Sequence, residues 1–172
     1  MTSLKRNILC MLAGLAVLAG VASCGIYSFT GTSIQPDVKS ITINFFEYTA
    51  PTVNPTLSND LSEAIRTQFR KMTRLEQVDM DGDLEISGTI TGYDVRASAV
   101  TANEVAAQNR LTITINVEFQ NRKYPEDDFT KSFSGYADYD SMQSLDAVQS
   151  SLCQEIIEKL VDDIFNATVA NW

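Results

Sequence analysis

The feature that most constrains the fold is a strict alternation of apolar and polar side chains over residues 111–119. The apolar positions are Leu111, Ile113, Ile115, Val117 and Phe119, and the polar positions between them are Thr112, Thr114, Asn116 and Glu118. Successive side chains of a strand point to opposite faces. The pattern therefore predicts a strand with one buried face and one face in water.

Two segments have the three-to-four spacing of amphipathic helices. The first begins at Thr56 or Ser58 and runs to about Arg74, and the second runs from about Ser141 to Thr168. The first stripe consists of Leu57, Leu61, Ala64, Ile65, Gln68, Phe69 and Met72. The second consists of Leu145, Val148, Leu152, Cys153, Ile156, Ile157, Leu160, Val161, Ile164 and Phe165.

Three further strands are expected. Lys39–Phe46 alternates with Ile41, Ile43 and Phe45 on one side, a half-buried strand. A long strand holds Leu84, Ile86, Ile90 and Val95, where Gly88 and Gly92 suggest bulges or a bend. The last is Phe129–Tyr139, with Phe133 and Tyr139 on one side and Tyr136 on the other. Residues 97–109 and 121–128 are predicted loops.

The resulting order is β-α-β-β-β-α. It predicts an α+β fold, with a four-stranded sheet and two helices packed on one face. The first two strands are joined through a helix, so they can be parallel with a right-handed crossover. Residues 37–172 form a single predicted domain, without repeats.

The N-terminus predicts export. Residues 1–7 carry Lys5 and Arg6 and no acid, and the apolar run over residues 8–19 is shorter than the about 20 residues of a membrane-spanning helix. The segment 21–24, Val-Ala-Ser-Cys, resembles a bacterial lipobox. We therefore expect a signal peptide over residues 1–23 and lipidation of Cys24, which would anchor the protein by acyl chains. An ordinary signal peptide with a chance cysteine is the alternative.

The residues after Cys24 set the expected location. Residue 25 is Gly rather than the Asp that usually retains lipoproteins at the inner membrane, and no acidic run follows. We expect the outer membrane, on its periplasmic side, with residues 24–36 as a lipidated tether. Cys10 would leave with the signal peptide, so Cys153 would be the one free thiol, and its place in an apolar stripe favours packing over catalysis.

Composition excludes several classes of protein. The 172 residues contain no His, which rules out Ser-His triads, Cys-His dyads and His-ligated metals. The chain has only 13 Lys and Arg residues against 22 Asp and Glu residues, so binding to nucleic acid is not expected. There is no Gly-x-Ser-x-Gly, phosphate loop or dinucleotide fingerprint. We predict a protein that is not an enzyme and uses no cofactor.

Two groups of charged residues are candidate sites. Asp79, Asp81 and Asp83 alternate around Gly82, but an EF-hand loop needs its Gly at the sixth position and Glu at the twelfth. A solvated acidic turn is the preferred interpretation. Basic residues gather weakly on the first helix and in the last hairpin; a solvated surface is preferred over an anion contact. They are Arg66, Arg70, Lys71, Arg74, Arg122 and Lys123.

The mature chain resembles the LptE family of lipopolysaccharide-assembly lipoproteins. The resemblance is carried by residues 24–31 after the lipobox, by the strand at 41–46, by Asn-Pro-Thr-Leu-Ser at 54–58 and by the Gly-Asp-Leu-Glu-Ile-Ser-Gly-Thr-Ile-Thr-Gly-Tyr segment at 82–93. Order and spacing carry much of it, because the family has no catalytic signature.

The resemblance implies a domain that sits inside the outer-membrane barrel LptD, helps the barrel assemble, plugs it and interacts with lipopolysaccharide. The family's lipopolysaccharide contacts are basic, and no Lys or Arg of this chain is assigned to them. Independently, the polar face of the sheet suits a polar barrel lumen. Two other functions stay open: a free-standing lipoprotein that binds a small ligand or glycan, and a hydrolase using Asp or Ser.

Overall fold

The computed structural model describes residues 34–98 and 108–169. The predicted signal peptide, Cys24, most of the tether and the centre of the loop predicted at 97–109 lie outside these residues. None of the helices in the described ranges is long and apolar enough to cross a membrane.

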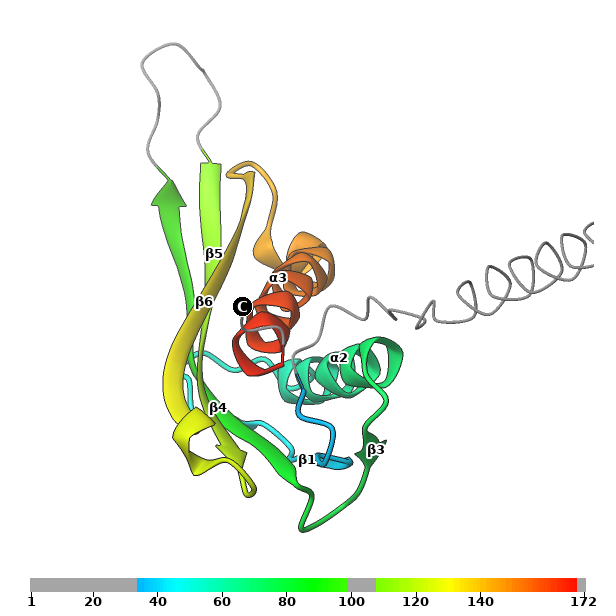
Figure 1. The fold of residues 1–172 in the computed structure, drawn as a ribbon. Coiled ribbons are helices and arrows are strands. Elements are labelled where there is room, and N and C mark those ends of the chain that lie inside the picture. Colours follow the sequence, from blue (N-terminus) through cyan, green and yellow to red (C-terminus); the bar gives the residue numbers. More distant parts are fainter. Residues whose placement is uncertain (1–33, 99–107, 170–172) are drawn as a thin grey trace, which may run out of the picture. The chain divides into compact units, whose positions relative to one another are not determined.

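One mixed sheet forms one layer of the domain (Figure 1). Its order is β3-β1-β4-β5-β6, and β2 also pairs with β4. The strands are β1 (Ser40–Ile43), β2 (Glu47–Tyr48), β3 (Glu76–Gln77), β4 (Leu84–Ser98), β5 (Gln108–Asn121) and β6 (Phe129–Asp140). β1 is parallel to β4, as the helical connection predicts, whereas β4, β5 and β6 are antiparallel.

The α+β class is confirmed, but the prediction of four strands is wrong, because the sheet has six. The predicted strand 39–46 ends at Ile43, and the chain rejoins the edge of β4 as β2. In between, the Phe46 N–H donates to Ser62 Oγ at 3.0 Å rather than to a strand. Phe46 is therefore buried and Phe45 is 55% exposed, the reverse of the alternation expected.

The interruption between β1 and β2 depends on a glycine in β4. A Cβ atom on Gly88 would lie 2.4 Å from Cε1 of Phe46, so the ring occupies the space that any other residue at position 88 would fill. The predicted irregularity in β4 is also present. The β4–β5 register shifts between Ile90 and Gly92.

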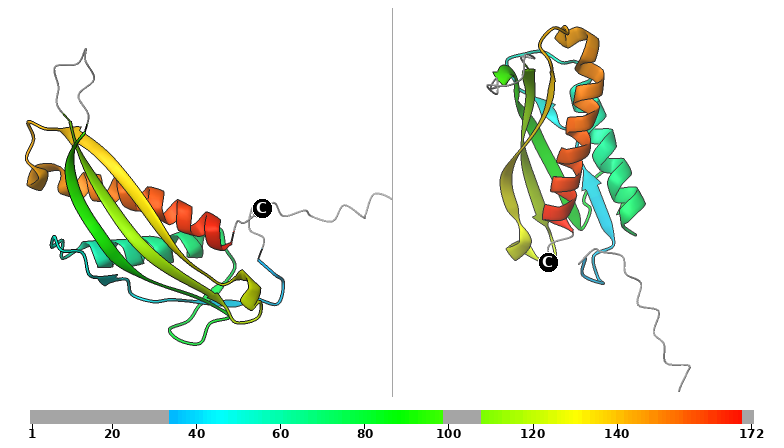
Figure 2. Two further views of the ribbon diagram at one scale, coloured as in Figure 1. Left: turned by 90° about the vertical axis from the view of Figure 1, so that its left-hand side faces the viewer. Right: turned by 90° about the horizontal axis from the view of Figure 1, so that it is seen from above.

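Two helices cover one face of the sheet (Figure 2). They are α2 (Leu57–Met72) and α3 (Leu145–Thr168). α2 contacts β1, while α3 contacts β5 and β6, and the rings of Phe69 and Phe165 join the helices with centroids 5.2 Å apart. Both helices are shorter than predicted. Ser144 is the N-cap position of α3, so residues 141–144 precede the helix, and Met72 is exposed where α2 ends.

The core lies between the helices and the inner face of the sheet. The fully buried side chains include Ile113 and Ile115 of β5 and Ile156 of α3. α3 approaches β6 closely at Gly135, where a Cβ atom would lie 2.9 Å from Cγ2 of Ile156. The predicted apolar stripe of α3 therefore faces the sheet.

Candidate functional site

The outer face of β4, β5 and β6 is a polar surface that no described element covers. Figure 2, left, looks onto this face, with the helices behind the sheet. Its central side chains are small and uncharged: Ser87, Thr89, Thr112, Thr114, Asn116, Ser132 and Ser134. We call these seven residues the outer polar face. It follows from the alternation along β5, which the structure confirms over residues 111–119.

Register places these side chains in rows across the strands. Asn116 lies between Thr89 and Ser132, and Thr114 lies between Gly92 and Ser134. The hydroxyls of Thr114 and Ser134 are 3.3 Å apart, within hydrogen-bond distance. Between Asp94 beside Thr112 and Glu118 beside Ser87, the surface thus offers hydroxyl and amide groups, so it suits a polar protein surface better than an anionic ligand.

An ion pair borders this face at one end. The Arg110 guanidinium donates to both carboxylate oxygens of Asp138 at 2.7 and 2.8 Å, and its Cζ lies 3.9 Å from the centroid of the Tyr136 ring. These hydrogen bonds lower the pKa of Asp138. Lys159 reaches the same place from α3, where its Nζ donates to the Tyr136 carbonyl at 3.1 Å.

A second group of charges lies at the other end. Arg122 donates hydrogen bonds to Asp81 at 2.7 Å and to Glu85 at 2.8 Å. The bond from Arg122 to Glu85 is the main cause of the lowered pKa of Glu85. The Asp83 carboxylate accepts hydrogen bonds from the backbone N–H groups of Lys39 and Ser40. The hydrogen bond from Lys39 is the main cause of the lowered pKa of Asp83.

Two aspartates of the acidic segment around Gly82 therefore serve different partners. Asp81 binds Arg122, whereas Asp83 fixes the start of β1. In residues 34–98 and 108–169, no three His, Cys, Asp or Glu side chains are grouped as metal ligands. The segment acts as the turn that leads into β4.

The basic residues singled out in the sequence do not converge on one anion site. Arg66 binds Glu63 and the Ile43 carbonyl, and Arg70 lies 3.4 Å from the Gln77 amide oxygen. Lys123 binds Asp83 and the Asp37 carbonyl. These cations hold the loops of the domain together.

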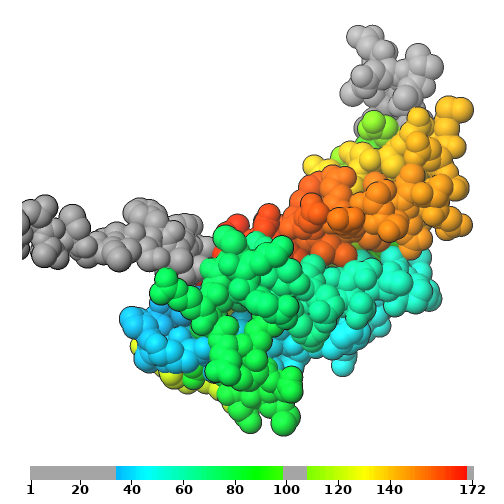
Figure 3. Space-filling view, turned by 90° about the vertical axis from the view of Figure 1, so that its right-hand side faces the viewer, coloured from blue at the N-terminus to red at the C-terminus, as the bar shows by residue number. Residues whose placement is uncertain are grey.

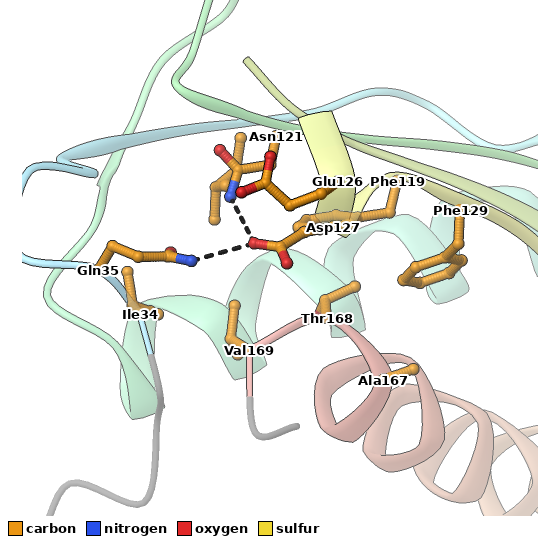
Figure 4. A pocket seen from close by; sticks show the side chains of 11 residues that line it. Ile34, Gln35, Phe119, Asn121, Glu126, Asp127, Phe129, Ala167, Thr168 and Val169 are labelled. Carbon is orange, nitrogen blue, oxygen red and sulfur yellow. Dashed lines mark hydrogen bonds between the residues drawn. The ribbon is translucent and has the colours of Figure 1, made fainter. Parts of the chain in front are cut away.

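A pocket of about 400 Å³ opens where the tether meets the domain (Figure 4). Phe119 and Phe129 provide apolar walls, while Glu126 and Asp127 line the polar side. Asp127 accepts hydrogen bonds from Gln35 at 3.0 Å and from Asn121 at 3.2 Å. With two carboxylates and no cation in its lining, the pocket opposes phosphate binding.

A groove of about 660 Å³ separates the first turns of the two helices, on the side shown in Figure 3. Cys153 lies at its base, only 6% exposed, with its Sγ 3.5 Å from Nδ2 of Asn54 and 3.9 Å from the Tyr93 hydroxyl. Burial raises the pKa of the Cys153 thiol, and this suits the predicted packing role.

A family model places the chain among known proteins. The model described as LptE, lipopolysaccharide-assembly, matches residues 38–168. No curated protein matches the sequence.

The chain is also similar to solved structures. A hypothetical protein from Chlamydia trachomatis superimposes with a TM-score of 0.52 at 8% identity, over 77% of this chain and 99% of that one. A minor lipoprotein from Acinetobacter baumannii gives a TM-score of 0.48 at 12% identity, over 74% and 89% of the two chains. At such identities the Chlamydia structure supports the fold alone.

Proposed function

Because the chain belongs to the LptE family of lipopolysaccharide-assembly proteins, we propose that it is an outer-membrane lipoprotein that supports lipopolysaccharide export as the non-enzymatic partner of an LptD-type barrel. The observation that carries the proposal is the family match over residues 38–168, nearly the whole described domain. The outer polar face supports it, because the domain leaves one side of its sheet uncovered.

The proposed anchor is Cys24, acylated after removal of residues 1–23. The stretch from Cys24 through residue 33, ten residues with Cys24 included, leads to Ile34, where the described domain begins. Ten extended residues span at most about 36 Å. Such a tether would keep the domain beside the periplasmic mouth of a barrel and raise its local concentration there.

The outer polar face is the proposed contact with the barrel. The lumen of such a barrel is polar, so its wall can exchange hydrogen bonds with the hydroxyls and amides of the face. Lack of charge at the centre avoids the cost of burying an unpaired ion in the complex. An interface of this kind is wet and depends on shape and hydrogen bonds.

The charge pattern argues for support of the barrel rather than capture of lipopolysaccharide phosphate by a basic cluster. The basic side chains Arg66, Arg110, Arg122, Lys123 and Lys159 each pair with a carboxylate of the domain. Those cations are already neutralised, and their pairing reduces the attraction for an anionic lipid.

Co-purification of the tagged, full-length lipoprotein from detergent-solubilised membranes tests the proposal. We expect the wild-type protein to bring down a large barrel, and depletion to lower barrel abundance and weaken the barrier to hydrophobic compounds. Asn116→Arg should reduce recovery of the barrel, whereas Gln154→Arg, which adds the same charge on α3, should not.

An unchanged barrel level after depletion, together with no recovered barrel, would contradict the proposal. The free-standing ligand-binding function would then be favoured by the pocket beside Phe119 and Phe129 (Figure 4), whose mixed apolar and acidic lining suits a neutral or cationic small molecule.

A further inference from the structure

The two edges of the sheet differ in length. One edge is β3, which contributes only Glu76 and Gln77. The other is β6, which runs over twelve residues from Phe129 to Asp140 and ends the strand order. Its pairing with β5 has no register shift, and β6 contains no proline. A long, regular edge strand is a template for another strand, so natural proteins usually shorten, bend or charge such edges.

The direction of the backbone groups on this edge follows from one contact. Lys159 reaches the Tyr136 carbonyl from α3 and also approaches the Tyr136 ring, 5.8 Å from its centroid, on the outer face. Lys159 therefore wraps around the free edge of β6. In an antiparallel strand alternate residues direct both N–H and C=O to the same side. Thr130, Ser132 and Ser134 are each an even number of residues from Tyr136, so their backbone N–H and C=O groups point to the same free edge of β6.

These three residues form an open stretch. No contact in the described part of the chain involves their backbone N–H or C=O groups beyond the pairing of β6 with β5. Their side chains are exposed, short and uncharged. At Tyr136 the carbonyl is already occupied by Lys159, whose ammonium also pairs with Glu155 at 2.8 Å. The open stretch is thus bounded at one end by a charged side chain.

We propose that the edge of β6 at Thr130–Ser134 binds an extended segment of the barrel partner by strand addition, with Lys159 setting where the added strand ends. This rests on the proposed function and names the surface that function would use. Backbone donors and acceptors in a row select an extended polypeptide, and the small hydroxyl side chains beside them leave room for a neighbouring strand. Ser132 and Ser134 belong to the outer polar face and Thr130 adjoins it, so the edge and the face can form one interface.

A second copy of this chain is a poorer occupant. The full sequence carries a net charge of −9, and loss of Lys5 and Arg6 with residues 1–23 makes it more negative, so two copies repel each other. A strand of a different protein avoids that repulsion. Its side chains beside Ser132 and Ser134 should be short or hydroxylated, as cross-strand neighbours on a polar face commonly are.

Site-specific photo-crosslinking in cells tests the proposal. A photoreactive amino acid is placed at Ser132 or Ser134 on the edge, at Asn116 on the outer face and at Gln154 on α3, in the full-length lipoprotein. We expect the two edge positions to crosslink to the barrel and Gln154 not to. Crosslinks from Asn116 but not from the edge would overturn strand addition and leave the proposed function intact. Crosslinks from the edge to a second copy would also overturn it, and no barrel crosslink at any position would count against both proposals.

A matched pair of substitutions measures the backbone contribution. Ser132→Pro and Ser132→Ala both remove the hydroxyl that donates to the Ile115 carbonyl at 3.3 Å, but only proline removes the edge N–H. We expect about tenfold weaker barrel binding for Ser132→Pro than for Ser132→Ala. Equal binding by both variants, with unchanged melting temperatures, would overturn the proposal. If Ser132→Pro does not fold, the crosslinking result decides.

Discussion

The two faces of β5 differ in what covers them. The inner side chains, from Leu111 to Val117, are fully buried beneath the helices, whereas the outer ones, from Thr112 to Glu118, have no described element over them. One strand therefore contributes apolar burial to stability on one side and an unpartnered polar surface on the other. Substitutions on the inner face should therefore affect mainly folding, and substitutions on the outer face should affect mainly partner binding.

The largest loss of stability is expected for Ile156→Ala, which empties a fully buried site against Gly135. Removing these carbons and leaving a cavity should lower the free energy of unfolding by about 2–5 kcal/mol. Denaturant unfolding of the domain measures it. An unchanged midpoint would contradict the contrast between the two faces of β5, because it would mean that burial on the inner face does not determine the stability.

A smaller loss is expected for Gly88→Ala. Its new methyl group would meet Phe46 and the Asn116 carbonyl, at 2.4 and 2.7 Å, and overpacking of this kind costs about 1–3 kcal/mol. Gly92→Ala is the matched control, since its Cβ would come no nearer than 3.1 Å to the Thr114 side chain. Equal melting temperatures for the two variants would show that the Phe46 ring can move away.

A pH-dependent contribution to stability is expected from the ion pair at the rim of the outer face. Arg110 lowers the pKa of Asp138 below its unfolded value of about 3.9, so the pair stabilises the fold above that pH. The contribution is lost as pH falls through the lowered pKa. Both side chains are partly exposed, so the effect is small. Wild type should be slightly more stable than Asp138→Asn at pH 6, and this difference should shrink as the pH falls through the lowered pKa of Asp138; a difference that stays constant would contradict the assignment.

The smallest change in stability is expected for Thr114→Ala at the centre of the outer polar face. A surface substitution here should alter the free energy of unfolding by less than about 0.5 kcal/mol, since it loses only the contact with the Ser134 hydroxyl. Thermal unfolding checks this. A loss comparable with that of Ile156→Ala would remove the distinction between the faces.

Local pattern was enough to predict the elements whose burial is regular. β5, most of β6 and the buried stripe of α3 follow directly from periods of two and of three to four residues. The break after Ile43 could not be predicted in this way. The side chains of Phe45 and Phe46 are equally apolar, and the choice between them depends on Gly88, which is distant in sequence.

Other features depend on pairing between distant segments. Glu76 and Gln77 lie in a polar stretch, and only their backbone pairing with β1 makes them a strand. The role of Asp83 depends on the N–H groups of Lys39 and Ser40. The open edge at Ser132 was missed for a similar reason, because a strand's own sequence does not show whether another strand follows it in the sheet. Cys24 stays a prediction, outside the described residues.

The burial of Cys153 has a consequence for redox chemistry. Disulfide exchange and alkylation proceed through the thiolate. Burial hides this sulfur and raises its pKa, and the hydrogen bonds with Tyr93 and Asn54 offset only part of that rise. Reagents should reach it when α2 and α3 separate at the groove. The rate of its alkylation would therefore report, without any label, how often the helical layer opens.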